Sequence, residues 1–134
     1  VDKNRPTILK KRYRIENKNL LKVSTLKDEI ISKNLQKKIY KKIEKKINKY
    51  DLIIFSDFNY GCLPENLINK LIRLAKRYKI TLVADSQSSS QIGSILKFNN
   101  LDLITPTEHE IRVSLNNNHD GLVELTKKLI KKTN

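Results

Sequence analysis

The sequence is poor in cysteine and lacks long apolar runs, and each shortage excludes a class of protein. Cys62 is the only cysteine among 134 residues, so no disulfide can form within the chain. No apolar run approaches the roughly 18 residues of a membrane span, and no signal-peptide pattern opens the chain. We therefore expect a reduced, cytoplasmic protein with no membrane partner.

Hydrophobic residues are scarce as well. They make up 38% of the chain, against about 45–50% in ordinary soluble domains. The length fits about one domain, but this shortage predicts a small core, or one that is completed by further chain. The first residue is Val1 rather than Met. We therefore expect residues 1–134 to form one partial domain, cut from a larger protein.

Acidic residues are few in the N-terminal part. Residues 1–50 contain 17 Lys and Arg against 5 Asp and Glu, whereas residues 51–134 carry a net charge of only +2. Such a basic segment could bind nucleic acid or an anionic membrane surface. Lysine is abundant throughout, however, and no nucleic-acid-binding motif occurs. We therefore interpret most lysines as ordinary surface residues and do not expect nucleic acid to be the partner.

The first half of the chain predicts a hairpin followed by a helix. Residues 6–15 and 20–24 have strand character around a polar turn, and their many basic residues indicate that neither face is fully buried. The hairpin region spans residues 1–28, and the α/β core is expected over residues 29–134. A helix over residues 32–49 is capped by Ser32. Its apolar stripe recurs every four residues and predicts docking on the core: Leu35, Ile39, Ile43 and Ile47.

From residue 51 onward, short apolar segments alternate with helical patterns. Strands are predicted over residues 51–56, 80–84 and 101–105, and helices begin near residues 64, 107 and 121. The first strand is a continuous apolar run, which is typical of a strand buried on both faces. The alternation predicts an α/β fold in which helices flank a mostly parallel, doubly wound sheet.

Three polar segments follow the three predicted strands, over residues 57–61, 85–91 and 105–110. Ligands of such sheets bind beyond the carboxyl ends of the strands. The first segment offers a carboxylate and an amide, or is a capping turn. The second suits sugar hydroxyls or phosphate oxygens, or is a solvated serine-rich loop. The third suits a metal-bound water or phosphate, or caps its helix. Together they predict one binding rim.

In their order and spacing, these segments resemble heptose-phosphate kinases of the ribokinase-like (PfkB) family. The resemblance extends along nearly the whole chain. It is carried by Arg5-Pro6-Thr7 with Lys10 and Arg12, by Asn17 and Leu20-Leu21-Lys22-Val23, by Ser56-Asp57-Phe58-x-x-Gly61, by Val83-Ala84-Asp85, and by Thr105-Pro106-Thr107-Glu108-His109-Glu110. It implies a partial ribokinase-like fold in which the hairpin belongs to a lid and makes homodimer contacts.

The resemblance also implies an activity and the residues that serve it. The implied activity is transfer of the ATP γ-phosphoryl group, with Mg²⁺, to a hydroxyl of a heptose phosphate or related sugar in lipopolysaccharide synthesis. The implied substrate-binding residues are Lys10, Arg12, Lys22, Asp57, Asn59, Asp85 and Ser86. Thr107 and Glu110 are assigned to the nucleotide and Mg²⁺ region, with Glu110 reaching the metal through water.

The chain also departs from the family pattern. Thr107 replaces an Asn, Ser86-Gln87 replaces Pro-Lys, and Tyr60 replaces a Lys. Neither the Gly-Gly region that binds the sugar nor the Gly-Ala-Gly-Asp motif that supplies the catalytic base occurs. We therefore assign no catalytic residue and expect no kinase activity from this chain alone. A non-catalytic scaffold and a basic nucleic-acid-binding module are the alternative interpretations.

Overall fold

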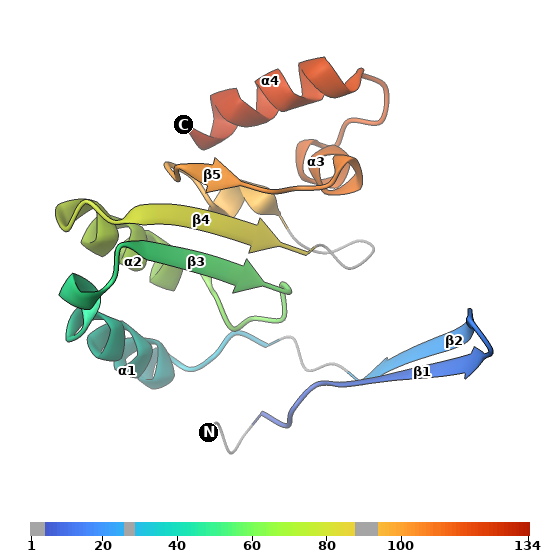
Figure 1. Cartoon of the computed structure of the whole chain (residues 1–134), viewed down its shortest axis with the longest axis horizontal. Helices are drawn as coiled ribbons and strands as arrows, with labels where there is room; N and C mark the ends of the chain where they lie inside the picture. The colour runs from blue at the N-terminus through green and yellow to red at the C-terminus, as the bar shows by residue number, and fades with distance from the viewer. Residues whose placement is uncertain (1–4, 26–28, 88–93) are drawn as a thin grey trace.

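The chain begins with a two-stranded antiparallel ribbon that projects from the rest of the molecule (Figure 1). The computed structural model describes residues 5–25, 29–87 and 94–134. Strand β1 spans Leu9–Ile15 and strand β2 spans Lys18–Thr25. All side chains of β2 are exposed. The predicted exposed hairpin is therefore confirmed.

The two faces of this hairpin differ in chemistry, because successive side chains of a strand point to opposite sides. Lys10 pairs with Ser24 and Arg12 pairs with Lys22, which makes one face basic. The other face pairs Lys11 with Val23 and Tyr13 with Leu21, next to Leu9. We call this second side the apolar face of the hairpin, defined by Leu9, Tyr13, Leu21 and Val23.

The body of the molecule is a three-stranded parallel sheet flanked by helices, in the order β3-β4-β5. The strands are β3 (Leu52–Asp57), β4 (Thr81–Ser86) and β5 (Leu103–Ile104). The helices are α1 (Lys33–Glu44), α2 (Glu65–Arg77), α3 (Glu108–Leu115) and α4 (Leu122–Thr133), with 3-10 turns η1 (Ile47–Lys49) and η2 (Ile95–Lys97). The predicted α/β class is confirmed. No helix in the described ranges is long and apolar enough to cross a bilayer.

The core lies between the sheet and α2. Phe55, Leu82 and Ala84 of the strands are buried against the inner face of α2. That face is the predicted one: Leu67, Ile68, Leu71, Ile72 and Ala75. Burial of each of its four Leu and Ile side chains contributes about 1.5–3 kcal/mol.

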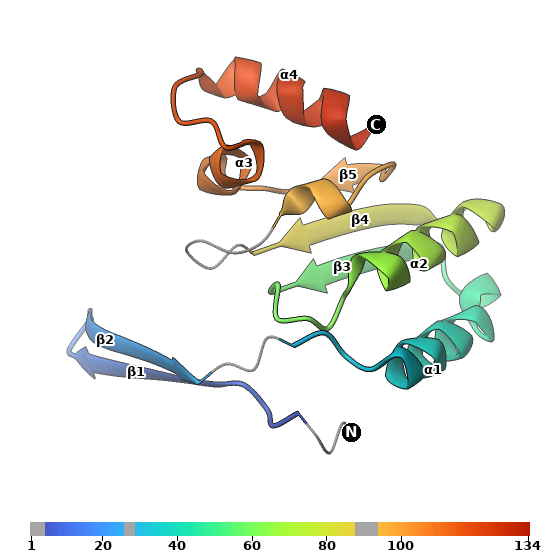
Figure 2. The ribbon, with the colours of Figure 1, turned by 180° about the vertical axis from the view of Figure 1, so that it is seen from behind.

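The prediction that the first strand is buried on both faces is wrong. On the face of the sheet away from the helices, Leu52, Ile54 and Leu103 are 46%, 60% and 53% exposed. Figures 1 and 2 show α1, α2 and η2 on the same side of the sheet. The strand order explains this, because two right-handed crossovers that advance in one direction place their connections on one face. Within the described residues the sheet is therefore covered on one side only, and the expected doubly wound arrangement is not formed.

Two helices also differ from their predictions at the ends. Ser32 caps α1 as expected, accepting from the Leu35 N–H at 3.2 Å, but α1 ends at Glu44 instead of residue 49. Ile47 still reaches the core, from the η1 turn. In α4, Leu125 and Leu129 are buried as predicted, whereas Leu122 and Ile130 are each 51% exposed, because α4 packs at the edge of the sheet.

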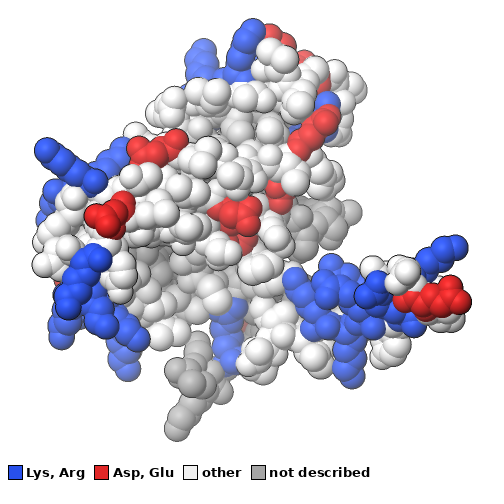
Figure 3. All heavy atoms as spheres, viewed as in Figure 1, with Lys and Arg blue, Asp and Glu red and all other residues white. Residues whose placement is uncertain are grey.

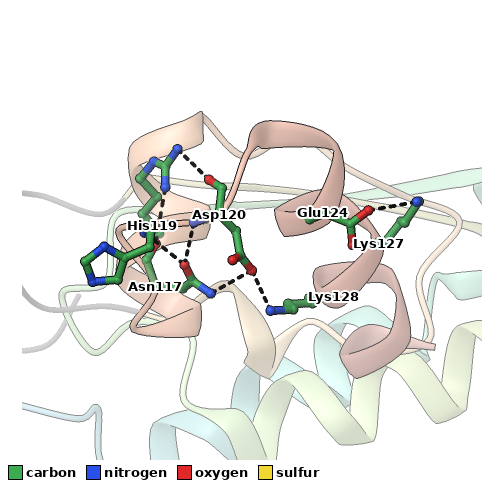
Figure 4. A network of polar contacts seen from close by, with 7 residues as sticks. Asn117, His119, Asp120, Glu124, Lys127 and Lys128 are labelled. Carbon is green, nitrogen blue, oxygen red and sulfur yellow. Dashed lines mark hydrogen bonds and ion pairs between the residues drawn. The ribbon is translucent and has the colours of Figure 1, made fainter.

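A polar network joins α3 to α4 (Figure 4). The Asn117 side chain donates to Asp120 Oδ2 at 2.9 Å and accepts from the Asp120 N–H at 3.0 Å. Lys128 of α4 forms an ion pair with the same carboxylate. The hydrogen bonds from Lys128 and Asn117 lower the pKa of Asp120 below its ordinary value of 3.8. This loop therefore holds α4 in place through a charged contact.

Candidate functional site

The carboxyl end of β3 carries a buried carboxylate. Asp57 is the last residue of the strand and only 2% exposed. Its Oδ1 accepts a hydrogen bond from the backbone N–H of Asn59 at 3.0 Å, which closes a tight turn. Asn59 has a φ of 57° there, in the left-handed region that asparagine tolerates better than most residues. The capping turn, which was the alternative interpretation of residues 57–61, is therefore present, and it fixes the position of the Asn59 side chain.

Asn59 connects this turn to the neighbouring strand. Its amide nitrogen donates to Ser86 Oγ and to the Gln87 carbonyl, both at 3.1 Å. The Gln87 N–H in turn donates to the Asp57 carbonyl at 2.8 Å. Four residues from the ends of β3 and β4 thus form one hydrogen-bonded edge, which we call the rim: Asp57, Asn59, Ser86 and Gln87. Residues 88–91 of the second predicted segment lie outside the described residues.

Lys97 of η2 completes the rim, and sequence reasoning missed it. Its ammonium forms an ion pair with Asp57 Oδ2 and donates to Asn59 Oδ1 at 2.7 Å. Removing one partner of a buried ion pair typically costs about 3–5 kcal/mol, because the other charge is left uncompensated. The only signal in the sequence was the position of Lys97 between apolar Leu96 and Phe98, which keep it close to the core. Among 28 Lys and Arg this signal was too weak.

Asp85 lies at the same edge but on the other face of the sheet. Asp57 and Ser86 are buried on the helix-covered side, whereas Asp85 alternates to the open side and is half-buried. There its carboxylate accepts from the Thr105 hydroxyl, which follows β5, at 3.2 Å. The carboxyl ends of all three strands therefore meet, as expected, but their carboxylates divide between the two faces.

Thr107 and Glu110 form a capping box at the start of α3. Glu110 Oε2 accepts from the Thr107 backbone N–H at 2.7 Å and from its hydroxyl at 2.9 Å. Glu110 is only 7% exposed. Within the described ranges, no three carboxylate, histidine or cysteine side chains are grouped to hold a metal ion. These residues alone therefore do not fit a direct Mg²⁺ site, and a water-mediated contact from Glu110 stays a prediction.

The basic face of the hairpin meets the β3–α2 loop at Lys10. Its ammonium lies 5.1 Å from the centre of the Phe58 ring and 4.9 Å from that of Tyr60. The two rings are themselves stacked, with centroids 6.3 Å apart. Arg12 and Lys22 continue the basic face as a directly paired, exposed couple. Figure 3 shows how Lys and Arg gather on the hairpin.

The sequence-predicted residues therefore fall into three groups. Asp57, Asn59 and Ser86 are joined by hydrogen bonds in the rim, and Asp85 and Thr107 follow at the ends of β4 and β5. Lys10 contacts aromatic residues beside the rim. Arg12 and Lys22 continue the basic face along the hairpin, and Glu110 bonds to Thr107 in the capping box of α3. The rim groups hold one another in fixed positions, and the Lys10 ammonium beside them can attract a polar, anionic ligand to this edge.

Comparisons with known proteins find relatives that match nearly the whole chain. No family model matches the chain. The chain is 29% identical over 129 residues to the bifunctional protein HldE of Helicobacter acinonychis (strain Sheeba), and 30% identical over 128 residues to HldE of Helicobacter pylori (strain HPAG1). Each match covers 96% of this chain but 27% of the relative. The chain thus spans about a quarter of the length of the curated relatives that it matches.

Proposed function

We propose that this chain is the part of an ATP- and Mg²⁺-dependent sugar kinase of the ribokinase-like (PfkB) family that binds a heptose phosphate. The observation that carries the proposal is the rim, in which a carboxylate, an amide and a hydroxyl meet at the carboxyl ends of adjacent parallel strands. That edge is where sheets of this kind bind ligands. The similarity to HldE along 96% of the chain supports the same assignment. A cytoplasmic role in lipopolysaccharide synthesis follows from it.

In this proposal the chain binds and orients but does not transfer the phosphoryl group. Asn59 and Asp85 lie beside the sugar, and the buried Ser86 hydroxyl holds the Asn59 amide in place. Lys10 leads the basic face toward the sugar phosphate, with Arg12 and Lys22 behind it. Thr107 and Glu110 border the nucleotide. ATP with Mg²⁺ supplies the phosphoryl group and neutralises its charge. The described residues do not themselves form a direct site for the metal.

The structure also gives a reason to consider a non-catalytic, sugar-binding scaffold as the second candidate. Thr107 and Glu110 are engaged with each other in the capping box, and Tyr60 stacks on Phe58 where the family has a lysine. A scaffold of this kind would keep the sugar site and lose the nucleotide site. Binding of the sugar phosphate with no binding of ATP by the intact gene product would favour it.

The test is a titration of the isotope-labelled chain with a heptose phosphate, followed by nuclear magnetic resonance. We expect shifts of the Asn59 and Ser86 amides, and binding at least about tenfold weaker for the unphosphorylated heptose, since the loss of charge-assisted bonds costs about 1.4 kcal/mol or more. Lys10→Ala is expected to weaken binding to a similar degree. Lys11→Ala is the matched control, because Lys11 lies next in the strand but on the opposite face.

The same sample tests the absence of catalysis. ADP release in the presence of ATP, Mg²⁺ and the heptose phosphate is expected to equal the blank without protein. Turnover by the chain alone would refute the assignment of a binding role. A titration without shifts at the rim, or with equal effects of the Lys10 and Lys11 variants, would contradict the sugar site.

We also propose that two copies of the chain pair through the apolar face of the hairpin. An isolated two-stranded hairpin is marginally stable in water and needs a packing partner. The four apolar side chains of this face are between 42% and 55% exposed. A second copy would cover them.

A further inference from the structure

A second feature lies away from the rim, in a groove between α1 and α2. The groove has a volume of about 1380 Å³ and is formed by α1, α2 and the segments that precede them. Figures 1 and 2 show the two helices side by side on the covered side of the sheet. Pockets for small molecules typically measure about 300–1,000 Å³. The size of this groove therefore suits a segment of a macromolecule better than a metabolite.

Both walls of the groove are basic. Three exposed cations line it from each helix: Lys33, Lys37 and Lys41 of α1, and Lys70, Arg73 and Arg77 of α2. Glu65 is the one carboxylate among the described residues that line it. The α1 lysines are spaced four apart, an arrangement of like charges that destabilises a helix. The groove thus concentrates positive charge that its own walls do not neutralise.

Apolar side chains line part of the floor between these walls, next to the polar Ser32, Gln36 and Asn66. Ile30 is 66% exposed within the groove, and Tyr40 and Pro64 are partly exposed beside it. Burial and Glu44 raise the pKa of Tyr40 above its ordinary value of 10.0, while Arg73 and Arg77 act in the opposite direction. The guanidinium groups of α2 therefore face a side chain of α1, and the two walls act on the same space.

We propose that the α1–α2 groove binds an acidic amphipathic helix of a partner protein. The apolar side of such a helix covers Ile30 and Tyr40, and its carboxylates meet the two rows of cations. This is the helix-in-groove mode of recognition, in which residues three or four apart anchor one face. The inference does not depend on the proposed function, because no rim residue lines the groove.

Two other anionic partners fit the groove less well. A nucleic-acid duplex would place phosphates on the walls but keeps its base faces stacked inside, so nothing apolar covers the floor. Insertion of α1 into a membrane would need its apolar stripe, but Leu35, Ile39 and Ile43 of that stripe pack against the core. An amphipathic acidic helix matches both the charge of the walls and the apolar side chains of the floor.

The experiment measures fluorescence anisotropy of a labelled peptide of about 20 residues, with Leu at helical spacing and Glu between, as the 134-residue chain is added. A peptide of the same composition in scrambled order tests the apolar floor. Lys37→Glu combined with Lys41→Glu tests the α1 wall. Lys38→Glu combined with Lys42→Glu is its matched control, since those residues have the same spacing and charge on α1 but do not line the groove.

We expect the amphipathic peptide to bind with a micromolar Kd. The scrambled peptide and the Lys37/Lys41 variant are expected to give a Kd at least about tenfold higher, and the Lys38/Lys42 variant a Kd changed by less than about twofold. Arg73→Glu, with Lys76→Glu as its control, gives the same contrast from the other wall and does not depend on the folding of the α1 variants. The proposal would be overturned by equal losses of affinity for both α1 pairs, or by no binding of the amphipathic peptide. It would also be overturned if a single-stranded oligonucleotide or anionic vesicles bound more tightly through Lys37 and Lys41.

Discussion

With only three glycines in the chain, other residues occupy the left-handed backbone positions. Five described residues that are not glycine have positive φ: Glu16, Asn59, Lys79, Asn100 and Asn116. Asparagine tolerates this conformation, whereas Glu and Lys gain nothing there from a local side-chain hydrogen bond. Asn59 is the one of these five in the rim, where its conformation aims the amide at Ser86. At the residue scale, the left-handed backbone of Asn59 is therefore also what positions its side chain in the rim.

Lys79 is the position where a glycine would relieve strain without loss of a site. It follows α2 with a φ of 54°. The helix ends in a Schellman motif, in which the Ile80 N–H donates to Ala75 O at 3.1 Å and the Lys79 N–H donates to Lys76 O at 3.2 Å. We expect Lys79→Gly to raise the free energy of unfolding by about 0.5–1 kcal/mol. Glycine removes the cost of the left-handed conformation, and this gain exceeds the extra conformational entropy that glycine loses on folding. Urea unfolding measures this. Lys79→Ala keeps a Cβ and is expected to give no gain, so an alanine variant as stable as the glycine variant would contradict the explanation.

At the scale of elements, the sequence predicted most of the fold. Apolar periodicity located all three core strands and α2, and Ser32 and Thr107 cap helices as expected. It did not predict that the sheet is covered on one side, because an apolar run such as Leu52–Phe55 does not tell whether a neighbour lies on each face. Nor did it predict the end of α1, because the apolar spacing continues to Ile47, which lies in a 3-10 turn instead.

The candidate site was predicted only in part. The strand ends met because parallel topology requires it, which brought Asp57, Asn59 and Ser86 together. The role of Lys97 depends on the tertiary position of η2, and a single lysine in a lysine-rich sequence carries no such information. The division of Asp57 and Asp85 between opposite faces follows from strand alternation and could have been deduced once the strand boundaries were known.

The junction of α3 and α4 has a pH dependence with a defined sign. Lys128 and Asn117 lower the pKa of Asp120 in the folded chain, so its contribution to stability is present above 3.8 and is lost as pH falls through the lower folded value. We expect Asp120→Asn to unfold at lower urea concentration at neutral pH, and the difference from the unmodified chain to vanish near about pH 2. Glu124→Gln removes an equal charge from α4 and is expected to change less. A difference that persists at the lowest pH would contradict the assignment to the carboxylate.

At the scale of the whole molecule, two exposed apolar surfaces are candidates for the proposed contact between copies. One is the apolar face of the hairpin, and the other is the open face of the sheet with Leu52, Ile54 and Leu103. Within the described residues the hairpin projects from the body along most of its length (Figure 1). We therefore expect its burial to contribute more to the stability of the proposed pair.

We therefore expect a dimer that depends on concentration, becoming monomeric in the Leu21→Lys variant and unchanged in Ile54→Lys. Both residues are more than half exposed, at 55% and 60%, so each substitution is tolerated by the monomer. Light scattering coupled to size-exclusion chromatography over about a hundredfold range of concentration distinguishes them. The reverse pattern would identify the sheet as the interface.

The contact of Lys10 with Phe58 and Tyr60 has a practical consequence. The chain contains no tryptophan and five tyrosines, so its near-ultraviolet emission comes from phenol groups alone. One of these phenols lies beneath an ammonium from the hairpin, and its emission therefore changes whenever the hairpin moves away from the rim. Subtracting the emission spectrum of the Tyr60→Phe variant from that of the unmodified chain isolates the fluorescence of Tyr60. This fluorescence reports the position of the hairpin without an attached dye.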